Sequence, residues 1–213
     1  MSSYERTDVL DHNYIPKMTV FMIAVNVIVW IVLEWMGNTE SAEFMMTHGA
    51  LTVDQVRGGN WYVLFTSMFL HFGYIHLFQN MFVLFFASRY LEQEIGSLYY
   101  LLLYLLSGIV GNVCSYYVSL AGNDVLSVSA GASGAVFGVL GALVVLTLLK
   151  QGRLAWLGSR GMVIMAVLCV IQGFSTAGVN NVAHMSGMAC GAVMGLVYRF
   201  LNVFDSQNLR NRS

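Results

Sequence analysis

A serine and a histidine that could act together in catalysis lie at the starts of two separate apolar segments. Ser133 stands in the sequence Gly131-Ala132-Ser133-Gly134, and His184 is followed by a glycine at every fourth position. A serine hydroxyl is a weak nucleophile until a neighbouring base removes its proton, and histidine is the commonest such base. Small neighbours leave the hydroxyl accessible, and free N–H groups at a helix N-terminus could hold an oxyanion. The two residues are therefore a candidate nucleophile and base.

Each of these signals also has a simpler structural explanation when it is taken alone. The small residues around Ser133 suit a packing seam, which is common in membrane helices. A single histidine within a span is more often a structural or proton-relay residue. His76 and Asn80, four residues apart and so on one helix face, could donate to an oxyanion or form an interhelical hydrogen-bond pair.

The composition identifies the broad class of protein. Of the 213 residues, 57% are hydrophobic and only 10% are charged, whereas a soluble domain has about 25% charged residues. We therefore expect an integral membrane protein. The net charge of -1 gives no electrostatic basis for nucleic-acid binding. The three cysteines are far apart in apolar runs and are interpreted as small buried residues, so no metal or cofactor site is expected.

Six segments are apolar enough to be spanning helices, which need about 20 residues each. They cover roughly 18–36, 74–91, 97–119, 131–149, 161–175 and 182–203. The apolar stretch 61–73 is too short to cross beside the second span, so we expect it to dip into the outer leaflet against protein. The sequence thus predicts an all-α membrane protein, a bundle of six transmembrane helices with a membrane-dipping first outer loop.

Basic residues indicate the orientation, because Lys and Arg concentrate on the cytoplasmic side. With a cytoplasmic N-terminus, Arg57 is the one basic residue outside. The nine inside are Arg6, Lys17, Arg89, Lys150, Arg153, Arg160, Arg199, Arg210 and Arg212. We therefore expect both termini in the cytoplasm, with tails at 1–16 and 204–213 around a single domain at 17–203.

This orientation brings the polar residues of three spans to one depth. His76 and Asn80 fall near the outer end of the second span, while Ser133 and His184 fall in the first turns of the fourth and sixth. Glycines repeat at helical spacing in the fourth and sixth spans, so we expect these two helices to pack closely. The outer halves of these spans hold no Asp or Glu, so any Ser/His site would be a dyad. Phe137 could stack on the imidazole.

Two other kinds of site do not fit the spacing. A zinc protease of the HExxH type needs two histidines four apart with a glutamate between them, but His71 and His76 are five apart without one. A transporter or channel usually carries charged residues in mid-span or paired half-helices. The polar groups within the spans here are neutral ones.

In combination, the motifs resemble the rhomboid family of intramembrane serine proteases. The chain has His71-x4-His76-x3-Asn80, the Gly-x-Ser-Gly motif around Ser133, and Ala183-His184 followed by glycines, in this order. The resemblance covers about residues 17–203 and is specific as a combination, although no single motif is.

The resemblance implies hydrolysis of transmembrane protein substrates near their outer ends, in the bilayer and without a cofactor. It implies Ser133 as the nucleophile, His184 as the base, and His76 and Asn80 as oxyanion donors beside backbone N–H groups. The residues expected to line the substrate site are Gly131, Ala132, Phe137 and His71. We expect a multi-pass protein of a prokaryotic plasma membrane.

The sequence departs from the family pattern at two places. The family usually has Trp-Arg before the first histidine, whereas Trp61 is followed here by Tyr62; Glu92 matches the acidic position that commonly partners that Arg. Phe137 stands where the family often has Tyr, which keeps a ring but removes a hydroxyl. The main alternative function is a rhomboid-like pseudoenzyme that binds and sorts membrane proteins. Such relatives usually lack the serine or the histidine, and both are present here.

Overall fold

The computed structural model describes residues 14–149, 158–176 and 178–210, and regular structure in these ranges is helical. The long helices are α1 (Lys17–Met36), α5 (Gly73–Ile95), α6 (Ser97–Ala121), α7 (Ser133–Leu149), α8 (Gly158–Ser175) and α9 (Asn181–Arg210). Short helices fill the segment between α1 and α5: α2 (Ala42–Thr47), α3 (Val53–Arg57), α4 (Val63–Thr66) and the 3-10 helix η1 (Ser67–Phe69). The predicted all-α class is confirmed.

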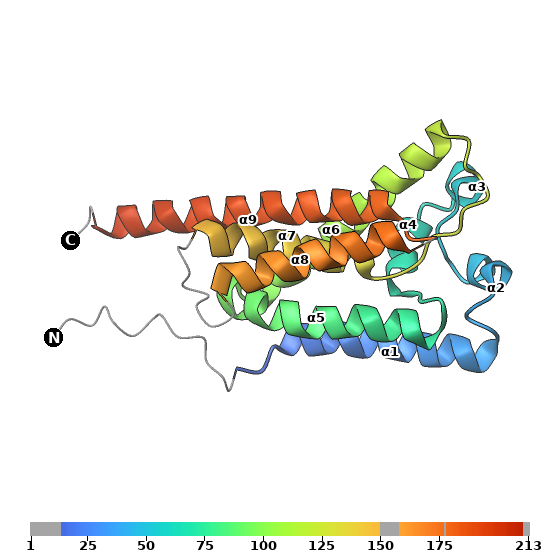
Figure 1. Ribbon diagram of the computed structural model, residues 1–213, viewed down its shortest axis with the longest axis horizontal. Coiled ribbons are helices and arrows are strands. Elements are labelled where there is room, and N and C mark those ends of the chain that lie inside the picture. The colour runs from blue at the N-terminus through green and yellow to red at the C-terminus, as the bar shows by residue number, and fades with distance from the viewer. Residues whose placement is uncertain (1–13, 150–157, 177, 211–213) are drawn as a thin grey trace.

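The long helices lie side by side, and α2, α3 and α4 gather at one end of the bundle (Figure 1). We call this the loop end. Helices α5, α7 and α9 all begin there, whereas α1 begins and α9 ends at the opposite end. The alternation of direction expected from the apolar segments is therefore present.

The apolar helices differ in length. Helices α1 and α6 are each long and apolar enough to cross a membrane, and α7 and Val163–Ser175 are shorter apolar helices. The pair Val63–Phe69 and Gly73–Ile95 forms a further candidate that bends by 89°. The bend falls in the stretch 61–73, where the sequence predicted a dipping segment instead of a straight crossing.

One boundary differs from the sequence expectation. Helix α9 continues to Arg210, so the predicted C-terminal tail from residue 204 begins as helix. The polar composition of residues 204–210 suggested a tail. An existing helix can extend into such a segment, because each added residue gains one backbone hydrogen bond and needs no apolar face. Residues 1–13 and 211–213 of the predicted tails lie outside the described part of the chain.

The closest helix contact joins α7 and α9 through glycine. A Cβ atom at Gly191 would collide with the backbone carbonyl of Gly138, and one at Gly187 would collide with that of Gly134. Gly141 likewise lies against the backbone carbonyl of Met188. The glycine spacing in the sequence predicted this contact, and glycine is required because the two backbones leave no room for a side chain.

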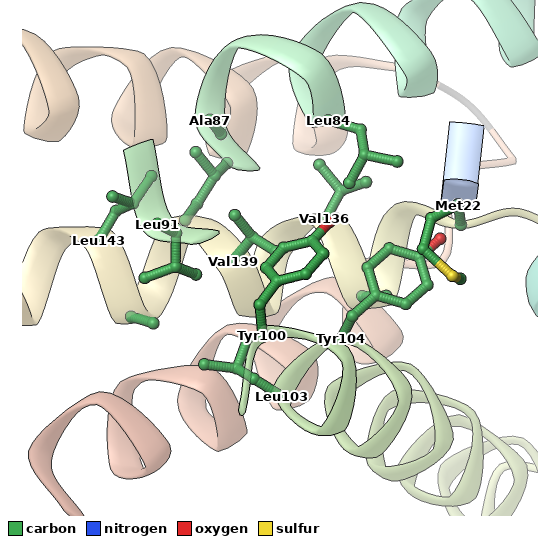
Figure 2. Close-up of a cluster of buried hydrophobic side chains, with 14 of the residues drawn as sticks. Met22, Leu84, Ala87, Leu91, Tyr100, Leu103, Tyr104, Val136, Val139 and Leu143 are labelled. Carbon is green, nitrogen blue, oxygen red and sulfur yellow. The ribbon is translucent and has the colours of Figure 1, made fainter. Parts of the chain in front are cut away.

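A layer of apolar side chains fills the space between four helices. It includes Met22 of α1, Leu84 and Leu91 of α5, Leu103 of α6 and Val139 of α7, all almost completely buried (Figure 2). Large apolar side chains also face outward on the long helices. Examples are Phe21, Phe78, Leu102, Leu168 and Phe200. A surface this rich in exposed apolar groups is suited to lipid.

Glu92 anchors the end of the bundle opposite the loop end. Its carboxylate accepts hydrogen bonds from the backbone N–H groups of Met18 (2.9 Å) and Thr19 (2.8 Å) at the start of α1. The hydroxyls of Thr19 (2.7 Å) and Ser97 (2.6 Å) also donate to it. Glu92 therefore caps α1 and stabilises its N-terminal partial charge. Tyr62 directly precedes α4 at the loop end, so Glu92 and Tyr62 lie at opposite ends of the bundle (Figure 1).

We predict that Gly191→Ala lowers the free energy of unfolding by about 1–3 kcal/mol, as overpacking does. The added methyl would meet a backbone carbonyl that cannot rotate away. Unfolding in detergent, followed by circular dichroism, would measure the change. Val193→Leu on the same helix is the control, because Val193 is 58% exposed. Equal stability of the parent and Gly191→Ala would contradict the close contact.

Candidate active site

A cavity of about 970 Å³ opens between the starts of α5, α7 and α9. Residues of α6 and α8 and of the segment 122–131 complete its wall. Ser133, His184, His76 and Asn80 all line it. The sequence placed these four residues at one depth, and the structure brings them to one cavity.

The segment before Ser133 is held by contacts from distant parts of the chain. The N–H of Gly131 donates to the carbonyl of Ser67 (2.9 Å), and the N–H of Ala132 donates to Nε2 of His71 (3.3 Å). Two residues earlier, Ser129 pairs with Leu51 through both backbone hydrogen bonds. These contacts fix where α7 begins and hence where the Ser133 hydroxyl lies.

Ser133 is the first residue of α7, and Ala132 accepts the first helical hydrogen bond, from the N–H of Val136 (3.0 Å). The N–H groups of the first helical turn have no partner within the helix. Ser133 and Gly134 both line the cavity. The start of α7 can therefore offer N–H groups to a negatively charged oxygen.

His184 is oriented by an aromatic ring. Its imidazole stacks on Phe137, with ring centroids 4.2 Å apart and planes 10° from parallel. The expected stacking is thus present, and it holds the plane of the imidazole one turn below Ser133. His184 is only 6% exposed. The glycine contact between α7 and α9 brings the first turns of both helices together, so His184 and Ser133 share the cavity.

His76 is held so that one ring nitrogen can donate. Its Nδ1 accepts a hydrogen bond from the backbone N–H of Phe72 (3.4 Å). In a neutral imidazole the other nitrogen, Nε2, then carries the proton and is a donor. One N–H of the Asn80 amide donates to the carbonyl of His76 (2.9 Å), which leaves its second N–H for another acceptor.

Gly131 lies between His76 and Ser133 in the wall of the cavity. A Cβ atom on Gly131 would lie 3.1 Å from Nε2 of His76 and 3.7 Å from Oγ of Ser133. Gly131 also has φ of +139°, which other residues rarely adopt. The nucleophile Oγ and the donor Nε2 thus lie on the same side of Gly131, and both of their residues line the cavity. This geometry suits a carbonyl that becomes an oxyanion.

The other residues predicted from the sequence fall into two groups. Gly131 and Phe137 line the cavity. His71 and Ala132 are completely buried behind the wall, where they bond to each other. Their position suits support of the Ser133 segment and not contact with a substrate. Trp61 and Tyr62 are both more than half exposed, and Trp61 packs edge-on against Tyr116.

The sequence analysis missed a polar network beside His184. The Asn180 amide donates to the hydroxyls of Ser115 (2.5 Å) and Ser129 (2.9 Å), and its oxygen accepts the N–H of Ala183 (3.0 Å). Asn180 therefore caps α9 and ties it to α6 and to the segment before Ser133. The pair Asn180-Asn181 directly before an apolar run was the available signal, because asparagine is a favoured helix cap.

A metal site needs several ligand side chains close together. Among the residues that the structure describes, no group of three or more His, Cys, Asp or Glu side chains lies close enough together to hold a metal ion. Asp124, an exposed residue at the cavity wall, is the one carboxylate among the described lining residues.

Comparison with known proteins identifies the family. Residues 58–200 match the family model described as Rhomboid domain. The chain is 30% identical over 185 residues to Rhomboid protease GluP of Bacillus subtilis, covering 85% of this chain and 35% of that protein. It is 34% identical over 174 residues to RHOMBOID-like protein 4 of Arabidopsis thaliana (78% and 42%). Rhomboid-like protein 11, chloroplastic, from the same plant is 30% identical over 203 residues (88% and 71%). The chain thus spans well under half the length of two of these relatives. It belongs to the rhomboid protease family.

Proposed function

We propose that the protein is an intramembrane serine endopeptidase that hydrolyses peptide bonds in or near transmembrane segments of membrane-protein substrates. One observation carries the proposal: Oγ of Ser133 and Nε2 of His76 lie on the same side of Gly131, at a cavity that His184 also lines. A nucleophile, a base and a donor around one cavity are the parts that acyl transfer requires.

The proposed reaction has two halves. Nε2 of His184 takes the hydroxyl proton of Ser133 while Oγ attacks the carbonyl carbon of the scissile peptide. The carbonyl oxygen becomes an oxyanion that accepts from Nε2–H of His76, the free amide N–H of Asn80 and the N–H groups at the start of α7. His184 then protonates the leaving amine, and the peptide C–N bond breaks. A water molecule, deprotonated by His184, hydrolyses the acyl-serine ester and restores the hydroxyl.

The remaining predicted site residues have supporting roles in this proposal. Gly131 leaves room for the substrate carbonyl, and Phe137 holds the imidazole plane. His71 and Ala132 position the Ser133 segment from behind. Each of the six long helices crosses the bilayer, with the stretch 61–73 dipping into the outer leaflet. The loop end faces away from the cytoplasm, both termini are cytoplasmic, and the membrane is the plasma membrane of a prokaryote.

The first prediction concerns the Ser/His pair. Ser133→Ala and His184→Ala should each abolish cleavage of a labelled single-span substrate, and the double variant should be as inactive as either one, because the two residues act as a unit. A serine-directed phosphonate should label the parent, fail on Ser133→Ala and label His184→Ala poorly. Robust cleavage by purified Ser133→Ala would overturn the assignment. Binding without cleavage by the parent would instead favour the pseudoenzyme.

The second prediction concerns the oxyanion donor. Asn80→Ala should lower kcat by about 10²–10³-fold with little change in KM, because an oxyanion donor acts mainly in the transition state. Steady-state kinetics in detergent or liposomes would separate the two constants. Asn60→Ala, at an exposed asparagine before α4, is the control and should keep the parent rate. Unchanged kcat in Asn80→Ala would return Asn80 to a purely structural role.

The third prediction concerns orientation. Reporter domains fused after Asn123 and after Gly178 should be found on the outer side. Asn123 follows the end of α6 and Gly178 precedes α9, which begins at the loop end (Figure 1). In this topology the sequence assigns nine of the ten basic residues to the cytoplasmic side. A fusion after Leu149 should be found in the cytoplasm. A cytoplasmic signal at either loop-end position would contradict the proposed topology.

A further inference from the structure

Two buried polar atoms beside the candidate dyad lack hydrogen-bond partners among the described residues. They are Nδ1 of His184 and Oδ1 of Asn181, and both are almost inaccessible to solvent. A buried polar atom without a partner destabilises the folded protein, because it has given up its hydrogen bonds to water. Two such atoms next to a proposed catalytic base therefore call for an explanation.

Gly173 of α8 brings the two atoms to one place. A Cβ atom on Gly173 would lie 2.8 Å from Oδ1 of Asn181 and 3.2 Å from Nδ1 of His184. The two atoms thus face the same point on the surface of α8, which has no side chain there.

The amide of Asn181 is already oriented for this contact. Its Nδ2 donates to the backbone carbonyl of Gly173 (3.2 Å), which identifies the other amide atom as the oxygen. That oxygen is an acceptor, so it can accept a hydrogen bond from Nδ1–H of His184 but cannot donate one. A partner of this kind selects the imidazole tautomer with hydrogen on Nδ1 and a free lone pair on Nε2.

We propose that Asn181 is the positioning residue for His184: its Oδ1 is the hydrogen-bond acceptor for Nδ1–H of the imidazole, beside Gly173. This inference rests on the proposed function, because it explains how His184 presents an unprotonated Nε2 to Ser133. The stack on Phe137 fixes the ring plane but does not distinguish the two tautomers or the two flipped ring positions. The hydrogen bond to Asn181 makes that distinction.

In a Ser-His-Asp triad the carboxylate holds the tautomer and orientation of the histidine. The asparagine of Cys-His-Asn proteases has the same place, and we assign that role to the Asn181 amide. It adds no buried negative charge, which a site within a membrane could hold only at high cost. The other titratable groups around His184 are His76 of α5, Ser133 of α7, Cys169 of α8 and the exposed Asp124. Within the described ranges, none of them forms a hydrogen bond with Nδ1 of His184.

The direct test reads the tautomer of His184 and does not depend on activity. The protein would be labelled with ¹⁵N-histidine in detergent, and the His184 ring nitrogens would be assigned by their loss in His184→Ala. We expect the parent to show a protonated Nδ1 and an unprotonated Nε2 at neutral pH. Asn181→Leu should give a mixture of tautomers. Gly173→Ala, which places a methyl between the two atoms, should give the same result through a different residue. An unchanged tautomer in both variants would overturn the inference.

A kinetic test introduces a charge beside His184 and measures the pH dependence of kcat/KM. Asn181→Asp keeps the size of the side chain but places a carboxylate at Nδ1, which stabilises the imidazolium. The acid limb of the pH profile of kcat/KM should therefore move to higher pH. Asn60→Asp adds the same charge at an exposed position and should leave the limb in place. Asn181→Leu should lower kcat by at least about tenfold with KM nearly unchanged.

The outcomes separate this inference from the proposed function. Ser133-dependent cleavage with an unmoved acid limb in Asn181→Asp and an unchanged tautomer in Asn181→Leu would reject the role of Asn181 alone. A parent that does not cleave would reject the proposed function, while the tautomer measurement would still decide whether Asn181 orients His184. Thermal unfolding of each variant, compared with the parent, would show whether a lost tautomer preference reflects a lost contact or a lost fold. If Asn181→Leu is folded and its His184 keeps hydrogen on Nδ1, the inference is rejected.

Discussion

The contact of backbone on backbone between α7 and α9 is the constraint on which the site depends. Gly138 and Gly191 leave no space between the two helices, as do Gly134 and Gly187 one turn nearer the loop end. Within a bilayer no hydrophobic force drives helices together, so close packing must supply the attraction. That contact also determines the separation of the first turns, and hence where Ser133 and His184 stand relative to each other.

The start of α7 is fixed from the loop end by hydrogen bonds of high sequence separation. Ser67 in η1, His71 between η1 and α5, and Leu51 between α2 and α3 hold three of the four residues before Ser133. The residues that they hold are Ser129, Gly131 and Ala132. Asn180 ties the same segment to the start of α9. The short helices between α1 and α5 are therefore part of the support of the site, because a nucleophile at a helix terminus is only as well placed as the chain that leads into it.

The two cavity histidines illustrate how the partner of one ring nitrogen assigns the role of the other. A backbone N–H donates to Nδ1 of His76, which makes its Nε2 a donor suited to an oxyanion. An acceptor at Nδ1 of His184, as we propose for Asn181, makes its Nε2 an acceptor suited to a hydroxyl proton. Two identical side chains in one cavity can then serve opposite functions without any charged partner.

The sequence by itself determined the class, the long helices and the depth of the polar residues. These features follow from segment length, hydrophobicity and basic-residue sorting, which are local properties. Glycine spacing also predicted the α7–α9 contact, because a missing side chain is visible in the sequence. The catalytic roles of Ser133 and His184 remain a proposal that both the motifs and the geometry support.

Only the tertiary structure decided which polar atoms meet. It placed His71 behind the cavity wall and Glu92 at the cap of α1, and it brought Oδ1 of Asn181 and Nδ1 of His184 to the same side of Gly173. Sequence spacing gives the face of a helix on which a residue lies, but the rotation of each helix is set by packing against all its neighbours. A hydrogen bond depends on a few tenths of an ångström, and that precision arises only when the whole bundle is assembled.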